Sequence, residues 1–217
     1  MVNLQKNPQQ HKNIAFVLGN GVSRLSANLS SLKEHGVVYG CNALYREYTP
    51  DHLIAVDVKM VNEIIDTGYQ NTNSVWTNNN KGVKSFDNIN VLNPHKGWSS
   101  GPTALWLAAT HGYKEIYILG FDYEGLKGFV NNVYSGTPNY KGQYEAATFF
   151  GNWSSQTEKV IKEYAGVKFY RVLSPTRFTP PTWKNDMPNL VHISYSDLES
   201  KFLGITNIPK NDQKPVI

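Results

Sequence analysis

The sequence predicts an α/β fold in which a mainly parallel sheet is covered by helices on both faces. Continuous apolar runs that are too short for helices recur along the chain. Segments in which apolar residues have helical spacing lie between these runs, and several of the runs end abruptly at Gly, Asn or Asp. Strands that are apolar along their whole length are buried on both faces, which is typical of a parallel sheet with right-handed crossovers.

The apolar runs predict strands that follow one another along the whole chain. They lie at 13–18, 37–41, 53–56, 74–76, 89–92, 115–120, 167–172 and 190–194, the run at 89–92 being the weakest. Helices are predicted between them at 24–34, 59–67, 100–110, 154–164 and 197–202.

Two of these helices depend on specific signals. In 24–34, Leu25, Leu29 and Leu32 recur at spacings of four and three and form one apolar face. In 100–110, a cap at Ser100 and Pro102 in the first turn are signals of a helix start.

The 217 residues favour a single domain at 13–204, with a lid insertion at about 123–153 that is rich in Gly, Asn and aromatic residues. The two ends, 1–12 and 205–217, are polar and contain Pro, so we expect flexible tails there. No apolar run is long enough to cross a bilayer, and the first residues lack the apolar stretch of a signal peptide. We therefore expect a soluble, cytoplasmic protein.

Composition excludes several classes of site. The single cysteine, Cys41, excludes a disulfide framework and a cysteine-based zinc site, and the absence of an Asp-x-Asp pair argues against a bound metal. A formal net charge of +4 favours partners that carry phosphate. Lys and Arg form no block longer than two residues, so nucleic acid is a less favoured partner. The sequence is compatible with a homo-oligomer as well as with a monomer.

The residues that follow the predicted strands are the candidate site, because ligands of open α/β sheets bind at the carboxyl ends of the strands. They are Gly19, Asn20, Gly21 and Ser23 after the first strand, Asn42 after the second, Asp57 after the third, and Asp122 and Tyr123 after the sixth. The glycine pair lets the backbone approach a phosphate or ribose, and a following helix start offers free N–H groups. The alternative is a tight turn in which Ser23 caps a helix. We expect the first, second and sixth loops to meet in one pocket.

A second helix start at Ser99, Ser100 and Gly101 offers two hydroxyls without a bulky side chain. Two such starts can hold a nucleotide between them. The alternative is that Ser100 only caps its own helix.

Four motifs in order carry a family resemblance: G-N-G-x-S after the first strand, C-N after the second, S-S-G at a helix start, and G-Y-K-E-I-Y-I-L-G-F-D-Y at 112–123. Between about residues 13 and 172 the chain resembles the bacterial sialyltransferases that modify lipooligosaccharides with a CMP-sugar, and related uncharacterised glycosyltransferase domains. The resemblance implies a single Rossmann-like domain with a lid. It also implies transfer of a sugar from a nucleotide-sugar donor to a glycan or other hydroxyl acceptor, with inversion, without a metal and without a further cofactor.

By resemblance, Asn20, Gly21 and Ser23 contact the phosphate or ribose, and Asn42 binds the nucleotide. Ser99, Ser100 and Gly101 then hold the ribose or base edge. Asp122 and Tyr123 occupy the place of an Asp-aromatic stretch that leads into the lid, where tyrosines of the family assist the departing phosphate.

The chain departs from the family in two places. Gly97-Trp98-Ser99 stands where the family has a basic residue, and residues 112–191 contain no histidine to match the family's general base. The candidate replacements are Asp57, Asp122, Glu124, Glu145 and His95. For Asp57 the alternative is a helix cap, for Asp122 a turn closed on its own backbone, and for His95 an ordinary surface position.

The lid insertion combines aromatic residues with glycines. The aromatics are Phe129, Tyr134, Tyr140, Tyr144, Phe149, Phe150 and Trp153. Such a segment is suited to stacking on sugars and excluding water, or else to pinning a long loop as a satellite cluster. Lys127 and Lys141 could offset phosphate charge.

Three hypotheses follow from the sequence. The preferred one is a glycosyltransferase that uses a nucleotide-sugar. The second is a nucleotide-binding module that has lost catalysis, and the third is an enzyme that glycosylates or otherwise modifies nucleic acid.

Overall fold

The fold is built on one eight-stranded parallel sheet with the strand order β5-β4-β3-β2-β1-β6-β7-β8. It comes from a computed structural model that describes residues 13–173, 178–183 and 187–207. The strands are β1 (Ile14–Leu18), β2 (Val37–Cys41), β3 (His52–Ile54), β4 (Val75–Thr77), β5 (Ile89–Val91), β6 (Glu115–Leu119), β7 (Lys168–Val172) and β8 (Leu190–Ile193). The predicted parallel α/β architecture is confirmed, and each strand lies within about two residues of its predicted range.

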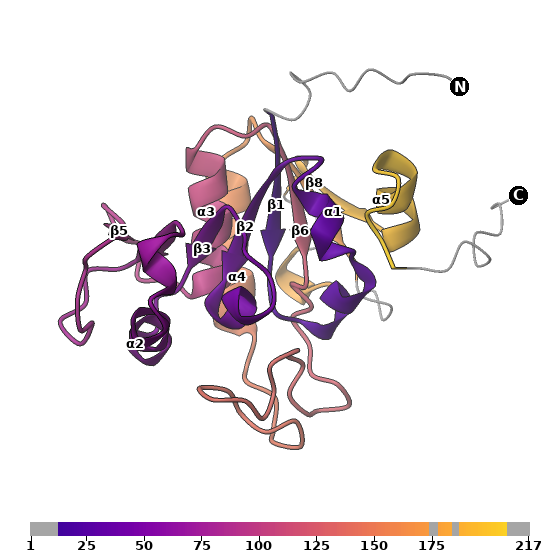
Figure 1. Ribbon diagram of the computed structural model, residues 1–217. Coiled ribbons are helices and arrows are strands. Elements are labelled where there is room, and N and C mark those ends of the chain that lie inside the picture. Colours follow the sequence, from indigo (N-terminus) through magenta and orange to yellow (C-terminus); the bar gives the residue numbers. More distant parts are fainter. Residues whose placement is uncertain (1–12, 174–177, 184–186, 208–217) are drawn as a thin grey trace, which may run out of the picture.

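Helices cover both faces of the sheet, as predicted (Figure 1). They are α1 (Leu29–Leu32), α2 (Val58–Thr67), α3 (Ser100–Thr110), α4 (Gly151–Glu163) and α5 (Tyr195–Lys201). Alternate side chains of β1 point to opposite faces, as the strand period requires. Phe16 belongs to the core shared with α1, α2 and α5, and Val17 to the core shared with α3 and α4.

The helix α3 is apolar on nearly all sides because it is packed between the sheet and α4. Its N-cap is Ser99, whose side chain makes no capping hydrogen bond, and Ser100 is the first helical residue. The sequence placed the cap one residue too late. The hydroxyl of Ser100 is therefore available for contacts outside the helix.

The predicted helix at 24–34 is wrong. A 3₁₀ segment (Val22–Ser26) is followed by a bridge between Ala27 and Thr206, and only then by the short α1. Leu25, which was expected on the apolar face, is 63% exposed. The returning carboxyl-terminal segment pairs with the chain at Ala27 and interrupts the helix, and local spacing cannot reveal such a contact.

The same bridge moves the boundary of the carboxyl-terminal tail that was expected at 205–217. Ile205 is fully buried and Thr206 pairs with Ala27, so the packed part of the chain continues beyond residue 204. The remaining tail residues, 208–217, and the expected amino-terminal tail, 1–12, lie outside the described residues.

The insertion after β6 lies at the carboxyl end of the sheet, where Figure 1 shows it as irregular loops below the arrowhead of β1. It ends at Phe150, since α4 begins three residues before the predicted helix start, and Trp153 therefore lies on that helix. None of the described helices has both the length and the apolar character that crossing a membrane requires.

Candidate nucleotide-sugar site

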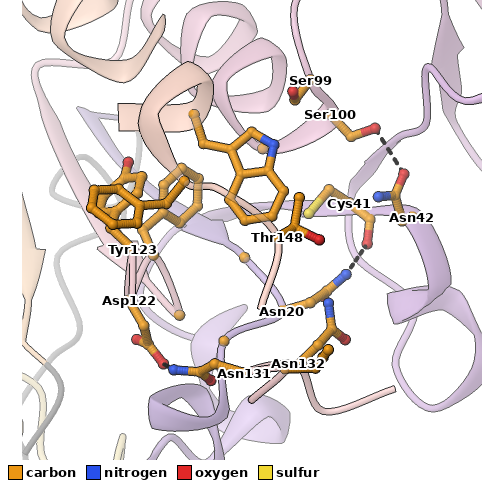
Figure 2. Close-up of a pocket in the computed structure, with 18 of the residues that line it drawn as sticks. Asn20, Cys41, Asn42, Ser99, Ser100, Asp122, Tyr123, Asn131, Asn132 and Thr148 are labelled. Atoms are coloured by element: carbon orange, nitrogen blue, oxygen red, sulfur yellow. Dashed lines mark hydrogen bonds between the residues drawn. The ribbon is translucent and has the colours of Figure 1, made fainter. Parts of the chain in front are cut away.

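A cavity of about 410 Å³ lies at the carboxyl ends of β1, β2, β3 and β6, with the insertion as its outer wall (Figure 2). Such a volume is in the range of small-molecule sites. The predicted residues that line it are Gly19, Asn20, Gly21, Asn42, Asp57, Ser99, Ser100, Gly101, Asp122 and Tyr123. The first, second and sixth loops therefore meet in one pocket, as expected. Among the described residues, Ser23 and His95 do not line it.

The two glycines after β1 are required by the neighbouring loop after β6. A Cβ atom on Gly19 would lie 2.5 Å from the carbonyl oxygen of Gly120, and one on Gly21 would lie 2.5 Å from Oδ2 of Asp122. The backbone N–H groups of Gly19 and Gly21 donate to the carbonyls of Leu119 and Gly120. The glycines thus allow these two loops to touch at the point where the strand order reverses, which is where such sheets bind ligands.

The carboxylate of Asp122 joins the loop after β1 to the insertion. It accepts hydrogen bonds from the backbone N–H and the hydroxyl of Ser23. It also accepts one from Nδ2 of Asn131 (Figure 2). Asp122 is buried, and so is Ser23. Ser23 therefore holds Asp122 rather than a ligand, and three donors already occupy the carboxylate that the sequence offered as a general base.

Arg171 on β7 fixes the backbone of the segment around Asp122. The buried guanidinium donates to the carbonyls of Phe121, Asp122 and Phe178. It also lies over the ring of Tyr123, whose hydroxyl donates to Thr157 at 2.7 Å. Because the Tyr123 hydroxyl is used inside the protein, its ring forms a wall of the cavity rather than a phosphate contact.

Asn42 and Ser100 connect two edges of the cavity. The Ser100 hydroxyl accepts from the backbone N–H of Val56 at 3.1 Å and donates to Oδ1 of Asn42 at 2.7 Å (Figure 2). Ser100 is buried, so this pair is fixed. The bond occupies the Asn42 carbonyl and leaves its Nδ2 group as a donor toward the cavity.

Asn20 has a hydrogen-bond acceptor that no described residue uses, whereas Asn42 has such a donor. Its Nδ2 donates to the carbonyl of Cys41 at 3.3 Å, which fixes the orientation of the amide, since its oxygen cannot face another carbonyl (Figure 2). Its Oδ1 is buried and has no hydrogen-bond partner among the described residues. A buried acceptor without a partner costs about 1–3 kcal/mol, and a hydrogen-bond donor brought by a ligand would offset that cost.

Tyr140 is a site residue that the sequence analysis placed only among the aromatic residues of the lid. Its hydroxyl accepts from Nδ2 of Asn20 at 3.4 Å and from the backbone N–H of Ala43 at 3.3 Å. Burial raises the pKa of this phenol well above its ordinary value. Tyr140 therefore stays protonated, and its own O–H remains available to donate into the cavity.

Two arginines, Arg46 and Arg24, hold the part of the insertion that carries Tyr140. Arg46 pairs with Glu63 at 2.6 Å and also donates to Thr137 and the carbonyl of Pro138. The buried Arg24 similarly donates to Glu47 and to the hydroxyl of Tyr134.

Asp57 is the carboxylate that remains free for a ligand. It occupies the N-cap position of α2, but it makes no capping hydrogen bond, and it is exposed to the cavity. His95, by contrast, is an exposed loop residue away from the cavity lining.

The charged residues in the lining are three carboxylates and one cation. The carboxylates belong to Asp57, Asp122 and Glu124, and the cation is Lys141. Among the described residues no group of three or more His, Cys, Asp or Glu side chains could hold a metal ion.

Comparisons with known proteins show the fold. No family model and no curated protein matches the sequence. The monofunctional alpha-2,3-sialyltransferase Cst-I from Campylobacter jejuni matches with a TM-score of 0.52 and 16% identity, over 93% of this chain and 97% of that one. The sialyltransferase CstII from the same organism, in complex with the substrate analogue cytidine-5′-monophosphate, matches with a TM-score of 0.49 and 17% identity, over 88% and 98%. The likeness to Cst-I shows a shared fold, as the sequence resemblance implied.

Proposed function

We propose that this protein is a glycosyltransferase that transfers a sugar from a nucleotide-sugar donor to a hydroxyl acceptor. The observation that carries the proposal is the cavity at the switch point, which is lined both by Asn20, whose Oδ1 has no partner among the described residues, and by the fixed amide of Asn42. The shared fold with Cst-I, a sialyltransferase, supports the same reaction class.

The two amides suit a nucleoside because they offer one acceptor and one donor. Oδ1 of Asn20 accepts from a ribose hydroxyl or from the amino group of a base, and Nδ2 of Asn42 donates to a base or ribose oxygen. The start of α3 at Ser100 and Gly101 supplies backbone N–H groups and the positive end of the helix dipole for the phosphate.

The charge of the cavity favours a donor with a single phosphate. Lys141 is the only cation in the described lining, against three carboxylates, so a nucleoside diphosphate would bring two adjacent anionic groups with little compensation. A CMP-linked sugar fits this balance better than UDP-, GDP- or ADP-linked sugars.

The reaction needs a base for the acceptor hydroxyl and a donor for the leaving group. Asp57 takes the proton while the hydroxyl oxygen attacks the anomeric carbon, and the bond from that carbon to the phosphate oxygen breaks with inversion. Tyr140 donates its free O–H to the departing phosphate. Asp122 positions the loop that carries Asn20 and Gly21 by holding Ser23. No step requires a metal ion.

A thermal-shift screen with CMP-, UDP-, GDP- and ADP-sugars tests the donor. A ligand that binds only the folded chain at about 100 times its Kd adds about 2.7 kcal/mol of stability, so we expect a clear rise in Tm with CMP-sugars. A larger rise with the diphosphate donors would contradict the charge argument.

Donor turnover tests the base. Asp57→Asn should lower turnover at least about 100-fold while the donor still binds. Asp66→Asn, on the same helix but paired with Lys84 at the surface, is the matched control. Nucleotide binding by the unmodified protein without any turnover would indicate an inactive module. Duplex binding that falls steeply with salt would indicate a nucleic-acid enzyme.

A further inference from the structure

The exposed aromatic side chains of the described residues gather in one region. Eight large hydrophobic side chains are exposed among the described residues, and five of them lie between residues 126 and 153, where bridges pair Phe129 with Leu126 and Ala146. These five are Leu126, Phe129, Tyr144, Phe149 and Trp153, whereas the other three, Leu25, Val91 and Leu203, are aliphatic. Exposed apolar groups that cluster in this way mark a binding surface.

Neighbouring groups hold these rings in place although their faces are open. Phe129 and Tyr144 meet edge to face with centroids 6.3 Å apart. Phe149 is 75% exposed, yet its ring lies so close to Gly151 that a Cβ atom there would be 2.3 Å from it. Phe149 also contacts Phe150, which in turn packs edge to face on Phe178. The rings are therefore preorganised before any ligand arrives.

The rings continue directly into the donor cavity. Ala147, Thr148, Phe150 and Trp153 line that cavity, so the chain between residues 144 and 153 runs from the exposed rings to its wall. An acceptor hydroxyl must come within about 3–3.5 Å of the donor's anomeric carbon, and the rest of the acceptor must then lie at this rim.

The polar contacts of the insertion are unevenly distributed. Residues 131–140 are fastened to the body by Asp122, Arg24, Arg46 and Glu63. Between residues 142 and 150, no side chain makes a hydrogen bond to another described residue. The side chains of residues 142–150 are thus open to a ligand, while backbone hydrogen bonds from Val130 to Glu145 and from Ala147 to Gly128 hold the segment in place.

We propose that Phe129, Tyr144, Phe149 and Trp153 form an acceptor platform on which the pyranose rings of an oligosaccharide stack. A pyranose has an apolar C–H face for the rings and hydroxyls for neighbouring polar groups, of which Thr148 and Lys141 lie on the cavity side. Four aromatic rings with only one exposed aliphatic neighbour, Leu126, suit this ligand better than a lipid surface. The assignment of these sugars as acceptors rests on the proposed function.

Saturation-transfer NMR with a panel of neutral di- to tetrasaccharides, in the absence of donor, tests the platform. We expect saturation of ring C–H protons in the unmodified protein. Phe149→Leu keeps an apolar side chain but removes the ring, so Kd should rise about three- to tenfold. Phe149→Tyr keeps the ring, so Kd should stay within about twofold. Leu203→Ala, an exposed residue outside the insertion, is the control.

The outcomes separate the platform from the donor site. Nucleotide binding without any saccharide binding would overturn the platform and leave the donor site standing. Saccharide binding that depends on the ring of Phe149, without nucleotide binding, would support a saccharide site and overturn the proposed function. Equal saccharide affinity of Phe149→Leu and Phe149→Tyr, or binding of the rings to lipid vesicles or to a second copy instead of saccharides, would overturn the platform.

Discussion

Ser100→Ala removes the hydroxyl that connects two edges of the cavity. Ser100 is 3% exposed. Its hydroxyl accepts a hydrogen bond from the backbone N–H of Val56 at 3.1 Å and donates one to Oδ1 of Asn42 at 2.7 Å. Without it, the N–H of Val56 loses its partner, which costs about 1–3 kcal/mol. Taking about 2 kcal/mol, Tm should fall by about 4–8 °C for a chain of this size.

The same substitution should weaken nucleotide binding, because the amide of Asn42 is no longer fixed. A loss of about 1 kcal/mol corresponds to a Kd about fivefold higher. The assays are thermal and urea denaturation without ligand, and calorimetric titration with CMP.

Ser99→Ala is the matched control for stability. The Ser99 hydroxyl makes no hydrogen bond to another described residue, so the free energy of unfolding should change by less than about 0.5 kcal/mol. Equal stability of the two variants would refute the bridging role of Ser100. An unstable Ser100→Ala protein that binds CMP with unchanged Kd would refute the orientation of Asn42.

Two further perturbations test the frame of the site, and a third tests two histidines that lie outside the cavity lining. Gly21→Ala should lower the free energy of unfolding by about 2 kcal/mol or more, because its Cβ would meet Asp122 at 2.5 Å, whereas Gly166→Ala, where the Cβ meets nothing, should be tolerated in urea denaturation. Arg171→Lys should cost about 2–4 kcal/mol in the same assay, since one ammonium cannot reproduce the donors that hold the loop after β6; an unchanged midpoint would contradict this. Burial lowers the pKa of His52 and His111 in the folded protein. As the pH falls through about 6.5, the unfolded chain therefore binds more protons than the folded protein does. The free energy of unfolding should then fall between about pH 7.5 and about pH 5.5. His52→Gln should reduce that fall, and a pH-independent midpoint would argue against lowered pKa values for these two histidines.

The parallel sheet could be predicted because its strands are apolar along nearly their whole length. The run at 14–18 is buried throughout. In a parallel sheet the carboxyl ends of neighbouring strands lie at the same edge, and this does not depend on the conformation of the loops. This is why Asn20, Asn42 and Asp57 could be grouped from the sequence alone. Each lies within three residues of the end of a strand, and the topology brings these ends together.

The contacts within the site could not be predicted, because they join residues that are far apart in the chain. Whether Asp122 faces a ligand or Ser23 depends on how the first and sixth loops touch. The role of Tyr140 likewise depends on its approach to Asn20 from the insertion. A pattern of residue types carries no information about which of several aromatic residues points inward.

The roles of the two candidate carboxylates differ for a similar reason. Both follow a strand, and only the structure shows that Asp122 is saturated with donors while Asp57 faces the cavity without a partner among the described residues. In the reaction that we propose, Asp57 takes the role of base by its position at the end of a strand and not by its residue type.

The most direct test of the account is a titration of the ¹⁵N-labelled protein with CMP, in which the side-chain amide signals of Asn20 and Asn42 are followed. We predict saturable shifts of both signals together with the backbone amide of Gly101. Saturable shifts confined to other parts of the chain, with these three signals unmoved, would show that the cavity is not the nucleotide site.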